Sequence, residues 1–229
     1  YLLQRDKLLC EFINTKKYLK VINGDSKLDF FNNWVIELKN NAYLHNHVRM
    51  WFASIWIFTL NLPWQLGANF FMENLLDGDP ASNTLSWRWV AGIQTKGKHY
   101  LARKKNIMKF SNITISNDIQ LNENTNYLTE NKHYLLKDLQ LSSDEITDLD
   151  SILIPSDELN FIINYKYKFK NIFSGIPFND YNDHNFSPKV LNHIKKIIVS
   201  NFEDNEFYRD NNYELYFEDY YNEFKKWIK

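Results

Sequence analysis

The 229-residue chain contains a single cysteine, Cys10, and this scarcity excludes several kinds of site. One cysteine cannot form a disulfide within the chain, and it cannot supply an all-cysteine zinc or iron–sulfur site. Such cysteine usage is typical of a reducing compartment, so we expect a cytoplasmic protein. Glycine and proline are also scarce, at six and five residues, whereas 44% of the residues are hydrophobic and 17% are aromatic. This composition is typical of a globular chain rather than a disordered one.

Long hydrophobic runs are absent as well. The longest, from Trp51 to Leu60, is far shorter than the roughly 18 apolar residues of a membrane span, and Asn61 and Pro63 end it. No signal peptide is visible at the start of the sequence. We therefore expect no membrane association. The first residue is tyrosine rather than methionine, which suggests a further upstream segment or a partner chain.

Acidic and basic residues nearly balance, at a net charge of −1, but they are unevenly distributed. Residues 1–110 hold 15 Lys and Arg against 8 Asp and Glu, whereas residues 111–229 hold 12 and 20. The segment 96–109, KGKHYLARKKNIMK, carries six basic side chains and no acidic one. A basic segment of this density can follow a phosphate backbone and release counterions, although a solvated face is the alternative.

Helical periodicity covers most of the first half of the chain. Residues 30–38 predict a short amphipathic helix, and residues 45–60, which are apolar nearly all round, predict a deeply buried one. Pro63 opens a third helix. The turn 77–80 separates it from a fourth, which ends near Gly92.

The second half is less regular. Residues 111–149 are rich in Asn, Ser and Thr, which predicts a loop-rich linker. A short apolar run at 150–159 predicts a buried strand, and the patterns at 187–202 and 213–228 predict helices. We therefore predict a mainly α fold with a helical region at 1–110, a linker at 111–149, and a small α/β or helical unit at 150–229.

Residues 78–89, GDPASNTLSWRW, combine two tryptophans with polar side chains in one predicted helix. Asn83 and Trp87 are four residues apart and share a face, whereas Trp89 points elsewhere. On another predicted helix, Arg49 needs a carboxylate partner if it is buried, and the 77–80 turn supplies two aspartates. An amide, an ion pair and indole faces suit a flat heteroaromatic ring with polar edges. The alternative is ordinary core packing with a structural ion pair.

Residues 43–50 (YLHNHVRM), 62–83 (LPWQLGANFFMENLLDGDPASN) and 86–89 (SWRW) resemble the FAD-binding helical domain of the DNA photolyase and cryptochrome family. Order and spacing agree over roughly residues 20–110. The resemblance implies a photolyase-like helical fold, FAD as the cofactor, and DNA containing pyrimidine dimers as the partner.

The resemblance also implies roles for individual residues. The implied flavin contacts are Asn46, Arg49, Asp77, Asp79 and Asn83, with Asn83 facing flavin N5. The implied catalytic group is Trp87 and Trp64, the proximal and middle tryptophans of a photoreduction chain, together with Asn83. The implied lesion or DNA contacts are Asn46, Met50, Trp89 and His47, and the basic segment adds Lys96, Lys98 and Arg103. We expect no metal site.

The chain also departs from the family pattern. The Thr/Ser loop that clamps the phosphates, the Trp-Arg segment and the N-terminal antenna domain are missing from this sequence. The distal tryptophan of the photoreduction chain cannot be placed, and we interpret Trp34, Trp51 and Trp56 as core residues.

The favoured function is light-driven repair of a cyclobutane pyrimidine dimer by electron transfer from FAD, the reaction of a deoxyribodipyrimidine photolyase-like lyase. Asn83, Trp89, Met50 and the basic segment support it. A cryptochrome-like blue-light sensor is an alternative that the acidic second half supports. A flavin-less DNA-binding or assembly module is the third, because part of the cofactor clamp is missing.

Overall fold

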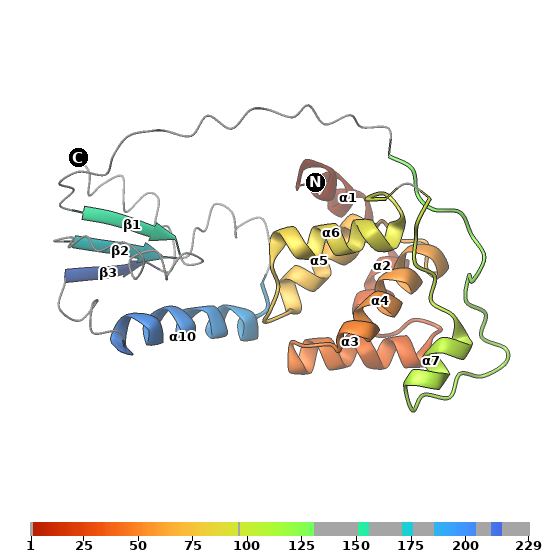
Figure 1. Cartoon of the computed structure of the whole chain (residues 1–229). Coiled ribbons are helices and arrows are strands. Elements are labelled where there is room, and N and C mark those ends of the chain that lie inside the picture. Colours follow the sequence, from red (N-terminus) through yellow and green to blue (C-terminus); the bar gives the residue numbers. More distant parts are fainter. Residues whose placement is uncertain are drawn as a thin grey trace. The chain divides into compact units, whose positions relative to one another are not determined.

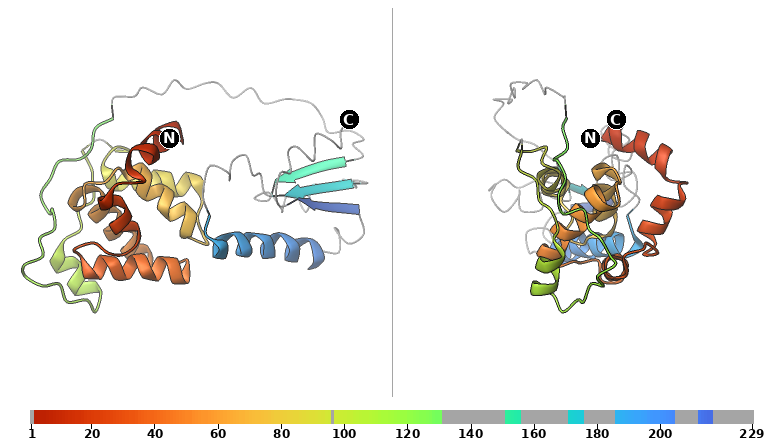
Figure 2. Two further views of the ribbon diagram at one scale, coloured as in Figure 1. Left: turned by 180° about the vertical axis from the view of Figure 1, so that it is seen from behind. Right: turned by 90° about the vertical axis from the view of Figure 1, so that its right-hand side faces the viewer.

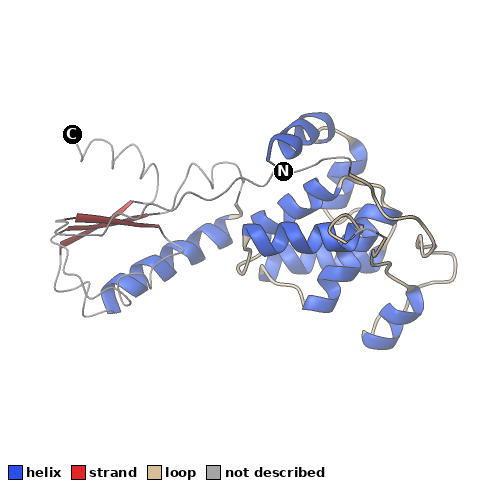
Figure 3. Cartoon of the chain, turned by 45° about the horizontal axis from the view of Figure 1, so that its top comes forward, coloured by secondary structure: helices blue, strands red, loops and turns tan. Residues whose placement is uncertain are grey.

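A computed structural model describes residues 2–95, 97–130, 151–155, 171–175, 186–204 and 212–216. The chain divides into two compact units, residues 1–132 and 133–229. Helices build the first unit, and the strands of the described residues lie in the second (Figures 1 and 3). The prediction of a mainly α fold is confirmed, whereas the three-part division of the chain stays a prediction.

The first unit consists of short helices joined by tight turns. They are α1 (Leu2–Phe12), α2 (Lys16–Ile22), α3 (Asp29–Asn41), α4 (Asn46–Ser54), the π-helix η1 (Ile55–Thr59), α5 (Trp64–Asn74), α6 (Pro80–Ala91) and α7 (Lys104–Phe110). The helix predicted over 45–60 is therefore α4 continued by η1. The other three helices predicted in this half correspond to α3, α5 and α6.

Local capping explains where α6 begins and ends. The side chain of Asp79 accepts a hydrogen bond from the backbone N–H of Ser82, and Pro80 occupies the first helical turn. At the other end Gly92 adopts the left-handed conformation, with φ of 80°, and its N–H bonds to the carbonyls of Arg88 and Trp89. These are the signals that predicted this helix from the sequence.

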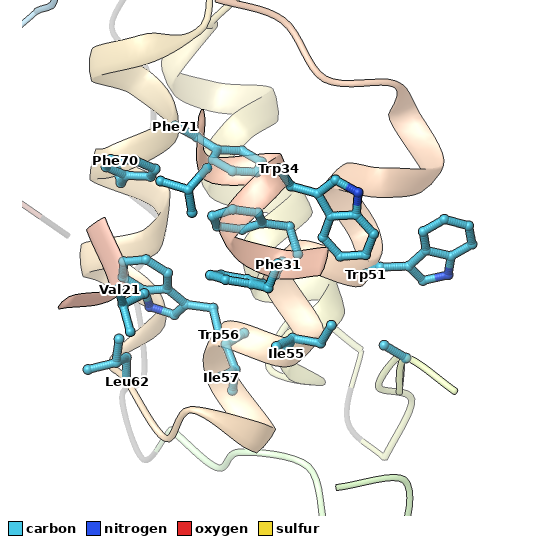
Figure 4. Packing of buried hydrophobic residues seen from close by; sticks show 14 of the residues in the cluster. Val21, Phe31, Trp34, Trp51, Ile55, Trp56, Ile57, Leu62, Phe70 and Phe71 are labelled. Carbon is cyan, nitrogen blue, oxygen red and sulfur yellow. The ribbon is translucent and has the colours of Figure 1, made fainter. Parts of the chain in front are cut away.

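The core of the first unit is unusually aromatic. Phe31, Phe52 and Trp56 are fully buried. The Phe52 ring meets those of Phe31, Phe70 and Phe71, and the Trp56 ring meets that of Phe70. Phe31, Trp56, Phe70 and Phe71 are labelled in Figure 4. The interpretation of Trp34, Trp51 and Trp56 as core residues agrees with their burial.

Residues 111–130 contain no helix or strand, yet they pack along the first unit. Ile115 is buried in the core. Asn122 donates from its side chain to the carbonyl of Phe58 at 3.1 Å, and the N–H of Leu128 bonds to the carbonyl of Ala91 at 2.9 Å. This part of the predicted linker therefore covers helices that precede it by tens of residues.

The second unit contains a parallel sheet in the order β1-β2-β3, formed by β1 (Ser151–Pro155), β2 (Asn171–Gly175) and β3 (Asn212–Tyr216). The helix α10 (Pro188–Asp204) connects β2 to β3, as a parallel pair requires. The strand predicted near 150–159 and the helix predicted near 187–202 are confirmed.

The helix predicted over 213–228 is wrong for residues 213–216, which belong to β3. These residues pair with β2 in a parallel ladder, and tyrosine is a residue type that strands favour. Pairing with a distant strand therefore overrides the local helical pattern. The rest of the predicted helix lies outside the described residues.

Helices α5 and α6 lie side by side in both views of the first unit (Figures 1 and 2). The contact between them depends on Gly67. A Cβ atom at this position would lie 2.2 Å from Cη2 of Trp87 and 3.0 Å from Nε1 of Trp56. Only a residue without a side chain therefore lets the Trp87 ring rest on the backbone of α5.

We expect Gly67→Ala to lower the free energy of unfolding by about 1–3 kcal/mol, because the added methyl group overpacks the contact. The substitution Trp87→Phe removes the indole atoms that clash. The free energy of unfolding that the double variant loses should therefore be smaller than the sum of the two single losses, by at least about 0.5 kcal/mol. Urea unfolding of the four proteins measures this coupling. Stabilisation by Gly67→Ala alone, as at an ordinary helical glycine, would contradict the contact.

Candidate functional site

A pocket of about 390 Å³ opens between α4, α6 and the turn that joins α5 to α6. It brings together most of the residues that the resemblance singled out, from three segments of the chain. The predicted site residues that line it are Asn46, Arg49, Met50, Asp77, Asp79, Asn83, Trp87 and Trp89.

Arg49 and Asp77 form an ion pair at the polar edge of this pocket. Nη2 of Arg49 donates to both carboxylate oxygens of Asp77, at 3.0 and 2.9 Å, and Nε donates to the carbonyl of Leu44 at 2.8 Å. The pair was expected to be buried, but the side chain of Asp77 is 55% exposed and that of Arg49 is 22% exposed. Solvent therefore screens this pair, which stabilises the fold less than a buried pair does.

Asp79 has a structural role in the pocket wall. Its carboxylate accepts from both the backbone N–H and the hydroxyl of Ser82, each at 2.7 Å. These hydrogen bonds, the backbone one above all, lower the pKa of Asp79. Asp79 therefore stays charged at the start of α6, where the helix dipole favours a negative group.

Asn83 connects α6 to α5 and faces the pocket. Its Nδ2 donates to the carbonyl of Ala68 at 2.8 Å, and this hydrogen bond fixes the orientation of the amide. No residue in the described part of the chain donates to its Oδ1. The pocket therefore receives a hydrogen-bond acceptor from Asn83.

The two tryptophans of α6 occupy different environments. Trp87 is 2% exposed, and its ring packs against Phe71 at 5.1 Å and Trp56 at 6.1 Å between centroids. Trp89 is 40% exposed and stacks on Tyr100 at 5.8 Å. The Trp87 ring thus forms the inner wall of the pocket, and the Trp89 ring forms a flat surface at its mouth.

Two predicted residues lie away from the pocket lining. Trp64 is buried at the start of α5, where the guanidinium of Arg88 lies 5.6 Å over its ring. His47 stacks between Trp51, at 5.0 Å, and Phe110, at 6.0 Å.

The basic segment is partly used inside the protein. Lys98 and Arg103 are exposed, and Lys96 lies outside the described residues. Nζ of Lys104 donates to the carbonyls of Ser116 and Ile119, at 2.9 and 2.6 Å. Lys104 therefore fastens the coil that follows α7, whereas Lys105 is exposed on α7.

Sequence reasoning missed three features of the site. Ser86 lines the pocket beside the predicted residues. Tyr100 supports the Trp89 ring, and Trp56 lies against Trp87 although 31 positions separate them in the chain. The helical spacing of Ser86 and Asn83 could have revealed Ser86, whereas the two ring contacts depend on the packing of distant segments.

The described residues contain no group of three or more His, Cys, Asp or Glu side chains placed to hold a metal ion. Within the same residues, no helix has the length and apolar character needed to cross a membrane.

Comparison with known proteins identifies this helical unit. Residues 25–132 match the family described as the FAD binding domain of DNA photolyase. This part of the chain is thus homologous to photolyases, which confirms the resemblance, and its fold is the helical FAD-binding domain of that family.

Among the relatives is a deoxyribodipyrimidine photo-lyase from Streptomyces griseus, 44% identical over 59 residues, or 26% of this chain and 13% of the relative. Another, from Buchnera aphidicola, is 32% identical over 92 residues, or 34% of this chain and 19% of the relative. The Escherichia coli enzyme is 36% identical over 64 residues, or 28% of this chain and 14% of the relative. The matched region thus spans less than a fifth of these relatives. No solved structure matches the chain significantly.

The capping carboxylate of Asp79 makes the stability of the first unit dependent on pH. Because its pKa is lowered in the folded protein, its contribution is present above the ordinary pKa of aspartate and is lost as the pH falls through the lowered value. We expect Asp79→Ala to cost about 1 kcal/mol at neutral pH, because the start of α6 loses its cap.

The variant Asp79→Asn is the matched control, since asparagine caps a helix well but cannot titrate. It should keep most of the stability at neutral pH and lose less of it on acidification than the wild type does. Urea unfolding at neutral and acidic pH tests both variants. Identical acid profiles for wild type and Asp79→Asn would contradict a native-state role for this carboxylate.

Proposed function

We propose that the pocket binds the isoalloxazine ring of FAD and that the protein uses blue light to split cyclobutane pyrimidine dimers in DNA. This proposal rests on one observation: a single pocket is lined by the ion pair, the amide and the two indoles that the resemblance implied, namely Arg49, Asp77, Asn83, Trp87 and Trp89. The homology of residues 25–132 to the FAD-binding domain of photolyases supports the same reading.

The chemistry of the pocket fits a flat, heteroaromatic ring system. The guanidinium of Arg49 favours negative charge at the polar edge of such a ring, and its pairing with Asp77 holds it in place. The acceptor Oδ1 of Asn83 suits an N–H group on the ring, and asparagine has no proton to transfer to it. The bound FAD would supply the light-driven electron transfer.

The phosphates of FAD need partners beyond the pocket lining. Among the described residues that line it, Arg49 is the cationic one, and it lies at the edge assigned to the ring, so the lining offers no second positive charge for the phosphates. These residues would therefore hold the ring of FAD rather than its diphosphate.

The mouth of the pocket suits a nucleobase. Trp89 offers a half-exposed indole on which a base can stack, which contributes about 1–3 kcal/mol per base in proteins that bind single strands. Tyr100, on which Trp89 stacks, belongs to the basic segment 96–109 itself. An aromatic platform and a basic segment thus adjoin each other, as recognition of a base and its phosphates requires.

Splitting a dimer in this pocket requires that the lesion leave the duplex. Extrusion costs a few kcal/mol, and it costs less for damaged pairs than for intact ones. Stacking on Trp89 offsets part of that cost, and the apolar side chain of Met50 lines the same pocket. These residues would hold the lesion and exclude water from it.

The direct test is repair of a dimer-containing oligonucleotide under blue light by the protein reconstituted with FAD. We expect light-dependent repair by the wild type. The variant Trp89→Ala should bind the lesion about 5- to 150-fold more weakly, the equivalent of one lost stacking contact. Leu85→Ala is the matched control, because Leu85 is exposed on the same helix and does not line the pocket.

Each of the other outcomes favours another function. FAD binding without repair would favour a blue-light sensor, and failure to bind FAD would favour a DNA-binding or assembly module. Equal lesion binding by Trp89→Ala and Leu85→Ala would remove Trp89 from the substrate site.

Two lysines of the basic segment have different surroundings. Lys105 is exposed on α7, whereas Lys104 donates to the coil at 116–119. We expect Lys105→Ala to reduce the slope of log affinity against log salt by about one, because one phosphate contact is lost. Lys104→Ala should instead destabilise the first unit, since the coil at 116–119 loses two hydrogen bonds. Fluorescence anisotropy across a salt series measures the slopes. An affinity that does not depend on salt would make the segment a solvated face.

A further inference from the structure

A chain of buried aromatic rings leads away from the pocket wall. The rings packed on Trp87 include Phe52, Phe71 and Trp56, at centroid distances of 6.5, 5.1 and 6.1 Å. Phenylalanine is very hard to oxidise, whereas indole loses an electron readily. Of these three neighbours, Trp56 is therefore the one that can exchange an electron with Trp87.

The same criterion, that the neighbouring ring can be oxidised, adds one more ring to the path. Trp56 packs against Phe52, Phe70 and Trp87, and against Tyr18 of α2 in an edge-on contact at 6.2 Å. Tyrosine is oxidisable once its phenolic proton can leave. Trp87, Trp56 and Tyr18 thus form a continuous path of oxidisable rings, with successive centroids 6.1 and 6.2 Å apart.

The surroundings of Tyr18 offer a destination for that proton. Burial raises the pKa of Tyr18 to about 12, and the negative charge of Glu73 adds to this rise. Nδ2 of Asn69 donates to Oε1 of Glu73 at 2.8 Å, and Arg5 donates to Oδ1 of Asn69 at 3.3 Å. Arg5, Asn69 and Glu73 thus form a polar network between α1 and α5 whose carboxylate acts electrostatically on the last ring of the path.

Trp64, the residue that the resemblance implies as the middle donor, has a less favourable environment for positive charge. The guanidinium of Arg88 lies 5.6 Å over its ring, where a cation stabilises the neutral indole and opposes its oxidation. The ion pair of Arg88 with Glu130, at 2.7 Å, weakens this effect. Trp56 instead donates its indole N–H to the carbonyl of Pro63 at 2.9 Å, which favours positive charge on its ring.

We propose that Trp87, Trp56 and Tyr18 form an electron relay that connects the pocket to a proton-accepting site at Glu73. The proposal rests on the proposed function, because light-excited FAD is the oxidant. With FAD bound, Trp87 would give one electron to the excited flavin, Trp56 would return one to Trp87, and Tyr18 would return one to Trp56 while its phenolic proton passes to Glu73. A soluble thiolate at the protein surface then gives one electron to the oxidised Tyr18, the proton returns to the phenol from Glu73, and two of the resulting thiyl radicals join as a disulfide.

The test compares photoreduction of bound FAD, with a thiol as the reductant, in matched variants. Trp56→Phe and Tyr18→Phe should slow the initial rate by about tenfold or more, which corresponds to about 1.4 kcal/mol in the barrier. Trp56→Tyr keeps an oxidisable ring and should recover part of the rate. Trp51→Phe is the control, because Trp51 is equally buried but stacks on Trp34 and His47 instead.

A second readout identifies the radical itself. Freeze-quenched samples of the illuminated wild type should show a tyrosyl signal by electron paramagnetic resonance, and deuteration of the tyrosine rings should narrow it. The signal should be absent from Tyr18→Phe and present in Trp51→Phe. The wild-type rate should also fall in D₂O, because the phenolic proton moves, and Tyr18→Phe should lose this dependence.

The outcomes separate the relay from the function on which it rests. A wild type that binds no FAD overturns both. Variants that bind FAD, with Trp56→Phe and Tyr18→Phe as fast as the wild type and Trp64→Phe slow, overturn the relay alone and assign the electron path to Trp64. A tryptophan signal without a tyrosyl signal likewise removes Tyr18 from the path.

Discussion

The contact between the Trp87 ring and the backbone of Gly67 is the constraint on which the rest of the site depends. It brings α6 against α5 at the closest distance that two helices allow at this position. With the helices at this distance, Nδ2 of Asn83 reaches the carbonyl of Ala68, and the Asn83 amide takes one orientation. The inner wall of the pocket is thus a product of tight helix packing rather than of a binding loop.

This packing gives the pocket two different sides. The inner side, at Trp87, is dry, rigid and aromatic, which suits electron exchange with a bound ring. The outer side, at Asp77 and Trp89, is exposed to water, which suits exchange of a polar partner. A single helix, α6, contributes to both sides because residues two positions apart point in different directions.

The sequence was sufficient where local signals decide the structure. Asp79, Pro80 and Gly92 mark the ends of α6, and the spacing of Asn83 and Trp87 places both on the pocket. It was insufficient where distant segments meet. The contact of Trp56 with Trp87 and the pairing of β3 with β2 depend on such packing, and so does the exposure of Asp77.

Residues 25–132, which match the photolyase family, also contain every residue that lines the pocket. The parallel sheet of the second unit has a topology and, in α10, a crossover helix. The proposed chemistry rests entirely on the first unit.

Titration of FAD into the purified protein tests the central claim most directly, because both proposals require a flavin in this pocket. The absorption spectrum of FAD should change on binding and saturate at one flavin per chain. The same titration with Asn83→Leu, which removes both the acceptor and the bond to Ala68, should give much weaker binding. A FAD spectrum that stays the same at every protein concentration would contradict the account.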